Sequence, residues 1–91
     1  MKTLPEGVEV YKQTDVFDQN TVPAGLLKDH NTVEGVWAEI IVIEGELDYI
    51  IQSTPPQQYK LNSEQRGIVE PKVLHYVIPS PSVRFYVRFY R

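Results

Sequence analysis

The chain has 91 residues, of which 42% are hydrophobic and 23% are charged, and this length and balance indicate one globular domain, residues 1–91. It contains no cysteine, so disulfides, thiolate zinc sites and cysteine nucleophiles are excluded. Nine basic residues against twelve acidic ones give a net charge of −3, which argues against binding to nucleic-acid phosphates.

The apolar runs are too short for a membrane span. The longest, residues 40–43, has four residues, against about 20 for a membrane-spanning helix. The amino end also lacks the apolar core of a signal peptide. We therefore expect a soluble, cytoplasmic protein with no membrane partner.

Seven prolines cut the chain into short segments, and no apolar pattern with helical spacing runs for ten residues. Alternation rich in valine, isoleucine, tyrosine and phenylalanine predicts strands instead. We expect them at Val8–Lys12, Ala24–His30, Val36–Ile43, Leu47–Gln52, Gln58–Leu61, Gly67–Glu70, Leu74–Ile78 and Val83–Tyr90.

The clearest hairpin spans residues 36–52, with Gly45 at its apex supplying the positive φ of a tight turn. Its first arm includes Ile40–Ile43, which is apolar on both faces and needs cover on each side. A two-sheet sandwich or a subunit interface provides such cover. Together with the many short strands, this arm favours an all-β antiparallel sandwich or barrel. The segment Ser53–Gln58 is expected to be an exposed loop.

The last expected strand has two different faces, one for the core and one that is aromatic and basic. The second face can bind an oxyanion through its guanidinium groups or pack against a second subunit. Packing is favoured because broad aromatic strand faces are seldom left to water, so we expect a homodimer. Stacking on single-stranded bases is the weaker alternative, and we expect no nucleic-acid partner. The core face is Val83, Phe85, Val87 and Phe89, and the other face is Arg84, Tyr86, Arg88 and Tyr90.

His30 and His75 are the two histidines, and imidazole is the commonest metal ligand and general base near neutral pH. On the expected strands, Leu26 and Lys28 share the face of His30, and two valines share the face of His75. An apolar surround lowers the pKa of an imidazole and favours the neutral form that binds metals. The pair is therefore a candidate for metal or ligand binding, with hydrogen bonding at strand ends as the structural alternative.

Residues Gly25–His30, followed by Gly35, Glu39 and Gly45, resemble the first signature motif of the cupin superfamily. Residues Gly67–His75, with a glycine turn, a proline and a strand histidine, resemble the second. The resemblance implies a double-stranded β-helix, a small jelly-roll barrel, in which the two histidines converge on a metal ion.

Four further segments narrow the resemblance to the small family related to the amino-terminal domain of the tellurite-resistance protein TehB. Members of that family are fused to a methyltransferase or stand free. This sequence has no glycine-rich nucleotide loop after a strand, so we expect the free-standing kind. The resemblance also implies an association with tellurite or related chemical stress. The segments are Leu4–Tyr11, Thr21–Leu27, Gly35–Trp37 and Val83–Arg91.

The sequence departs from the cupin pattern at two ligand positions. Thr32 stands where a typical cupin has its second histidine, and Ala38 stands where it has the ligand glutamate. Glu39 is one residue out of register and points inward only if its strand carries a bulge, the alternative being a solvated carboxylate. The candidate metal ligands are His30, His75 and Glu39. The implied ion is zinc, nickel or iron, with water or a carboxylate completing its shell.

Trp37 and Tyr76 are candidate walls of a ligand pocket, with simple core packing as the alternative for Trp37. We therefore expect a small cupin-type domain that binds a metal ion or a small molecule. Two alternatives stay open: a metal-dependent enzyme on a small molecule, with His75 as ligand or base, and a non-catalytic interaction module whose barrel is empty. The sequence assigns no catalytic residue.

Overall fold

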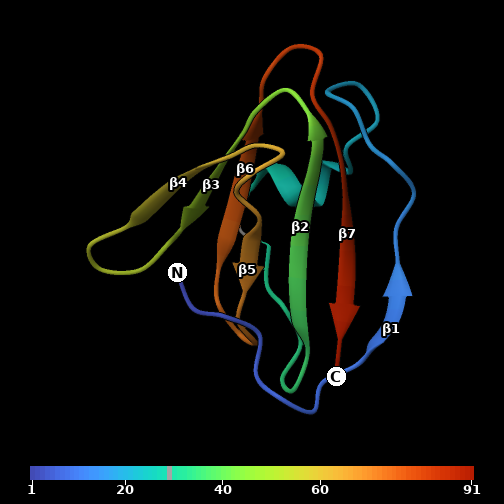
Figure 1. The fold of residues 1–91 in the computed structure, drawn as a ribbon. Coiled ribbons are helices and arrows are strands. Elements are labelled where there is room, and N and C mark those ends of the chain that lie inside the picture. Colours follow the sequence, from blue (N-terminus) through green and yellow to red (C-terminus); the bar gives the residue numbers. More distant parts are fainter. Residues whose placement is uncertain (29) are drawn as a thin grey trace.

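The computed structural model describes residues 1–28 and 30–91, and their regular secondary structure is almost entirely strand (Figure 1). The expected all-β class is confirmed. No described helix has the length and apolar character needed to cross a membrane. In chain order the elements are β1 (Val10–Gln13), the 3₁₀ helix η1 (Ala24–Leu27), β2 (Trp37–Glu44), β3 (Leu47–Ile51), β4 (Gln57–Leu61), β5 (Gly67–Val69), β6 (His75–Pro79) and β7 (Arg84–Tyr90).

The strands form two antiparallel sheets, and no single closed barrel, in the described part of the chain. One sheet has the order β1-β7-β2-β5 and the other has the order β4-β3-β6. The last strand, β7, lies between β1 and β2 (Figure 1). This order brings the segment before β1 beside the end of β7, and the backbones of Glu9 and Arg91 exchange two hydrogen bonds of 3.1 Å.

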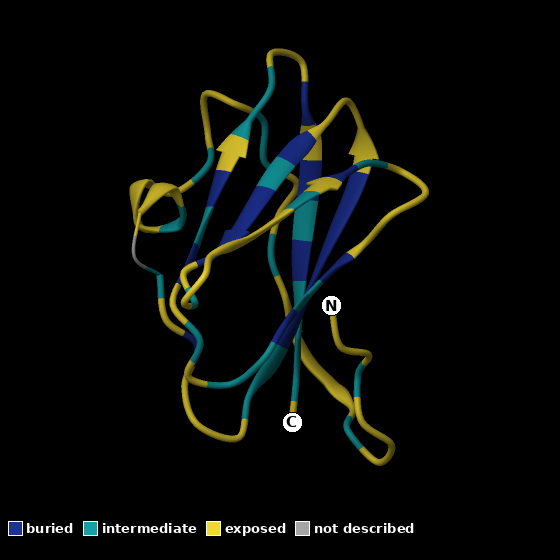
Figure 2. Cartoon of the chain, turned by 90° about the vertical axis from the view of Figure 1, so that its left-hand side faces the viewer, coloured by how far each residue is buried: buried dark blue, intermediate teal, exposed yellow. Residues whose placement is uncertain are grey.

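The core lies between the inner faces of the two sheets, seen as dark blue stripes along the strands in Figure 2. Strand β2 supplies Ala38, Ile40 and Val42 to it, and β3 supplies the fully buried Tyr49. On the outer face of β2, Ile41 is also buried, whereas Ile43 is 41% exposed. The arm Ile40–Ile43 is thus buried on both faces as expected, except at its last residue.

The expected core face of β7 is confirmed. Val83, Phe85 and Val87 are buried, and Phe89 packs against the core at its margin. Phe17 meets Phe85 edge-on, with ring centroids 5.7 Å apart. The alternating sequence of β7 therefore predicts correctly which of its side chains face the core.

One expected strand is wrong. The described residues of the segment Ala24–His30 do not form a strand, because residues 24–27 form η1 and His30 alone among them makes a β-bridge; residue 29 lies outside the described part of the chain. Pro23 begins the turn, and its carbonyl accepts a 2.9 Å hydrogen bond from the N–H of Leu26. The ring of a proline fixes φ at a value that suits the start of a helix, and this local preference overrides the weak alternation that follows. Leu26 and Lys28 therefore do not share a strand face with His30.

Gly45 closes the hairpin between β2 and β3 with a φ of +77°. A Cβ atom at this position would lie 2.8 Å from the Cα of Val83, so the turn requires both the positive φ and the missing side chain. Gly35 also has a positive φ, +80°, but a Cβ there would meet nothing within 4 Å.

These two glycines form a matched pair for mutation. We expect Gly35→Ala to lower the free energy of unfolding by about 1–2 kcal/mol, the cost of a left-handed residue with a side chain. Gly45→Ala should cost more, because the added methyl group also displaces the backbone at Val83. Urea unfolding of both variants measures the difference, and equal losses would contradict the close approach at Gly45.

Candidate functional site

Two histidines from distant parts of the chain meet at one antiparallel bridge. The backbone N–H of His30 donates to the carbonyl of His75 at 2.8 Å, and the reciprocal bond is 2.9 Å long. Their side chains lie on the same side of this bridge, with His30 Nδ1 3.3 Å from His75 Nε2. The rings are nearly perpendicular, at 80°, with centroids 5.0 Å apart. The structure thus brings together the two histidines that the sequence singles out.

The backbone around His75 fixes which of its nitrogens carries the proton. His75 Nδ1 lies 3.0 Å from the carbonyl oxygen of Val73, which can only accept a hydrogen bond. Nδ1 therefore carries the hydrogen, and the lone pair of a neutral His75 is on Nε2, facing His30. This is the orientation that second-shell partners give to metal-binding imidazoles.

The surroundings also keep both rings neutral. Burial lowers the pKa of His75, which is 3% exposed, and the nearby His30 lowers it further, while the hydrogen bond to Val73 acts in the opposite direction. Burial also lowers the pKa of the half-buried His30. Because the lone pair of His75 is on Nε2, the 3.3 Å contact is a hydrogen bond donated by His30 Nδ1–H. Both neutral rings can bind a metal ion, and His30 binds one through Nδ1 once its proton has moved to Nε2.

Both histidines line a cavity of about 220 Å³ between the two sheets. Its walls are mainly apolar, and its polar residues are Lys12, Thr14, His30, Thr32 and His75. Pockets of this kind, an apolar hollow with a few placed polar groups, are typical of small-molecule sites. The apolar walls include Phe17, Leu26, Val69, Val77 and Phe85.

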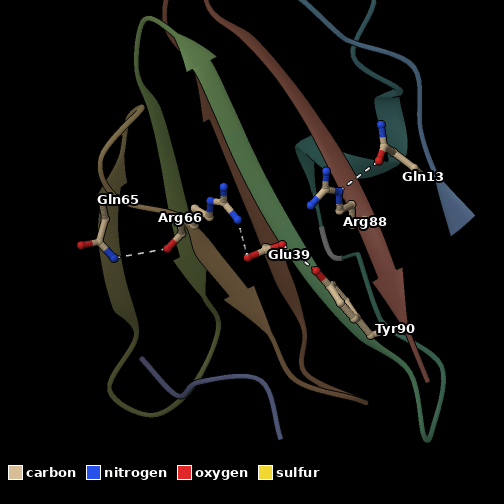
Figure 3. A network of polar contacts seen from close by, with 6 residues as sticks. All are labelled: Gln13, Glu39, Gln65, Arg66, Arg88 and Tyr90. Carbon is tan, nitrogen blue, oxygen red and sulfur yellow. Dashed lines mark hydrogen bonds and ion pairs between the residues drawn. The ribbon is translucent and has the colours of Figure 1, made fainter. Parts of the chain in front are cut away.

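Glu39 does not lie with the histidines. Ala38 and Ile40 line the cavity, and Glu39, between them, points to the opposite face of β2. Its Oε1 accepts a 2.8 Å hydrogen bond from the hydroxyl of Tyr90, and its Oε2 lies 3.2 Å from Arg66 Nη1 (Figure 3). No group of three histidine or acidic residues is close enough to hold a metal ion among the residues the structure describes.

The bulge that would turn Glu39 inward is absent at that position. The register of β2 with β5 runs without interruption through residues 38–40, and the irregularity of β2 lies between Val42 and Glu44. A regular strand alternates its side chains, so Glu39 stays on the outer face. Burial and the hydrogen bond from its hydroxyl to Glu39 raise the pKa of Tyr90.

Trp37 and Tyr76, the expected pocket walls, are not among the residues that line the cavity. Trp37 shares the outer face of β2 with Glu39 and pairs with Tyr90 of β7. Tyr76 alternates with the inward-facing His75 and Val77 of β6 and pairs with Ile50. Both aromatic side chains therefore belong to outer sheet faces.

Sequence reasoning did not assign Lys12 or Thr32 to the cavity, yet both line it beside His30. Lys12 reaches it because β1 pairs with β7 so that Lys12 is opposite Phe89, whose ring also lines the cavity. Nothing in the local pattern around Lys12 signals this pairing. Thr32 was recognisable only as the residue two positions after His30.

The fold and this cavity define a class: a small antiparallel β domain with a histidine pair at the wall of an internal hollow. Residues 12–87 match the TehB-like domain family, and the chain belongs to that family. No curated protein matches the sequence.

Two solved structures resemble the chain. A protein from Escherichia coli strain K12 has a TM-score of 0.90 at 21% identity, over 100% of this chain and 97% of that one, and shares the fold. TehB from Haemophilus influenzae has a TM-score of 0.83 at 25% identity over 91% of this chain. This chain spans 31% of the TehB chain.

The lowered pKa values of the two histidines predict how the stability of the metal-free protein depends on pH. The unfolded chain takes up protons near pH 6.5, where the folded chain does not, so the free energy of unfolding should be greatest above about pH 6.5 and fall as the pH is lowered toward 5. Urea unfolding at several pH values in the presence of a chelator measures this slope. His75→Gln should flatten it, and a stability that rises on acidification would contradict the prediction.

The contact between Glu39 and Tyr90 predicts a coupled pair on the outer face. Glu39→Gln and Tyr90→Phe should each lower the free energy of unfolding by about 1 kcal/mol, because each weakens or removes one buried hydrogen bond. The double variant should lose less than the sum of the two. A double-mutant cycle by urea unfolding measures the coupling, and strict additivity would show that the contact contributes nothing.

Proposed function

We propose that this TehB-like domain binds a divalent metal ion through His30 and His75 and presents it to a small molecule in the cavity. The observation that carries the proposal is the 3.3 Å separation of His30 Nδ1 and His75 Nε2 at the wall of that cavity. Two nitrogens bound at 2.0–2.1 Å to a tetrahedral ion lie about 3.3–3.4 Å apart. The apposed nitrogens are thus already spaced as two ligands of one ion.

The donor set fits an ion that accepts two imidazoles and completes its shell with water or a bound ligand. Imidazole nitrogen suits zinc, nickel and iron. Such an ion would supply Lewis acidity next to an apolar hollow. The chain's own contribution is to hold His75 in the tautomer whose Nε2 is free, through Val73, and to keep both rings neutral.

The wider proposal follows the family. We propose that the domain is of the cupin type, a small jelly-roll barrel, supported by the two facing antiparallel sheets and by the two histidines that meet at the cavity between them. Membership of the TehB-like family supports a role in resistance to tellurite or related chemical stress. A cytoplasmic homodimer is part of the same proposal, with the half-buried aromatic side chains on the outer face of β7 as the second-subunit contact.

Removal of either histidine tests the metal site. Wild-type protein stripped with a chelator should bind about one zinc, nickel or iron(II) ion per chain, and His75→Ala and His30→Ala should each weaken binding by more than about tenfold. Titration calorimetry and metal analysis give the affinity and stoichiometry. Glu39→Gln is the matched control, because Glu39 lies on the opposite face of β2 and its loss should leave metal binding unchanged.

Circular dichroism of each variant separates a lost ligand from a lost fold. Folded histidine variants that no longer bind metal support the proposal. A wild-type protein that binds none of the three ions would overturn it and favour the interaction module. A Glu39→Gln variant that loses the metal would place the site elsewhere.

A metal-dependent enzyme acting on a small molecule is the second candidate. The observation in its favour is that the Nε2 lone pair of His75 lies at a cavity wall on a ring of lowered pKa. A neutral imidazole in that position can act as a general base. In that case His75 serves as the ligand or as the base.

A further inference from the structure

Three polar side chains of the cavity lie together where the inner hollow meets a second one. The second hollow, of about 230 Å³, shares Lys12, His30, Thr32 and Phe89 with the first. Away from this junction the inner hollow is lined mainly by apolar side chains, with Thr14 and His75 as its other polar residues, whereas the junction carries an ammonium, a hydroxyl and an imidazole. The site therefore has an apolar chamber with a polar mouth.

The charge at this mouth is positive. Lys12 contributes an ammonium 5.8 Å from the centre of the Phe89 ring, at the rim of the cavity. None of the described residues that line either hollow is acidic, and Lys12 makes no ion pair within the described part of the chain. An anionic group at the mouth would therefore meet a cation with no competing carboxylate among those residues.

The mouth also holds the hydroxyl of Thr32. Its side chain makes no hydrogen bond with any described residue, although its backbone carbonyl accepts one from Lys72. The residue lines both hollows and its hydroxyl oxygen is not fully buried, so this group can bond a polar group of a ligand there. Lys12 and the hydroxyl of Thr32 can both donate to the same anion.

The inner chamber limits the size of the rest of the ligand. An apolar cavity of about 150 Å³ is large enough for a benzene ring. The chamber here, at about 220 Å³, accommodates one ring or a short branched chain. We propose that the cavity binds a small organic monocarboxylate, with its apolar body in the chamber and its carboxylate held by Lys12 and Thr32. This inference rests on the proposed function in taking the cavity as the ligand site, but it requires no metal.

Phenylacetate and its neutral isostere phenylacetamide test the inference on chelator-treated protein. Chemical-shift titration of backbone amides at low salt should show phenylacetate binding, with the largest shifts around residues 30–32 and 75. Phenylacetamide should bind about tenfold more weakly, because it lacks the charge that Lys12 meets. Acetate, which has no apolar body, and sodium tellurite, an inorganic oxyanion, should bind more weakly still.

Two substitutions locate the carboxylate. Lys12→Met keeps the apolar stem and should weaken phenylacetate binding by about fivefold at low salt, with a smaller difference in 0.5 M salt, at about a 4 Å Debye length. Thr32→Val keeps the shape and should weaken binding by about three- to tenfold. Lys60→Met is the matched charge control, because Lys60 pairs with Asp48 and does not line either hollow, and it should change the affinity by less than about twofold.

The outcomes separate this inference from the proposed metal site. Phenylacetate binding that depends on Lys12 and Thr32 supports the inference, whether or not His75→Ala abolishes metal binding. Equal binding of phenylacetate and phenylacetamide overturns it, as does an equal loss in Lys12→Met and Lys60→Met. Tighter binding of tellurite than of phenylacetate also overturns it, in favour of an inorganic oxyanion.

Discussion

The bridge between His30 and His75 is the constraint on which the site depends. Two backbone hydrogen bonds hold a segment that has no strand of its own against the first residue of β6. They fix the distance between the two rings, and the carbonyl of Val73 then fixes the proton on the buried one. The same bridge helps to place Thr32, two residues further on, beside the cavity, whereas the third polar group of the mouth, Lys12, depends on the pairing of β1 with β7.

The two faces of strand β2 carry different kinds of side chain. Its inner side chains are small or aliphatic and leave room for the cavity, while its outer face carries a carboxylate shielded by Tyr90 and Arg66. The Arg66 side chain is 54% exposed, so water screens its ion pair with Glu39 and the pair contributes little to stability. The outer network therefore serves chiefly to satisfy Glu39, whereas the inner face borders the cavity.

The sequence predicts a strand well where burial determines which of its side chains face the core and which face outward. The alternation of β7 is of this kind, and so is the hairpin with Gly45 at its turn. The segment Ala24–His30 does not form the expected strand, because Pro23 and one local hydrogen bond, rather than burial on a sheet, decide its conformation. The two histidines could be chosen from the sequence because their residue type is rare and their motif context is distinctive.

The rest of the site could not be read from the sequence, because it depends on register. Glu39 would face inward only if β2 had a bulge next to it, and the bulge of β2 lies further along the strand. The rim position of Lys12 depends on how β1 pairs with β7, two strands separated by most of the chain. Local patterns do not encode such pairings.

The cavity depends on the position of β7 in its sheet. This strand is last in the sequence but lies between β1 and β2, and it supplies Phe85, Val87 and Phe89 to the cavity wall. Contacts between segments so far apart form late, because closing a long loop costs entropy before any contact rewards it. The hollow and its mouth are therefore complete only when β7 is in place, and a chain in which β7 is not paired with β1 and β2 lacks both.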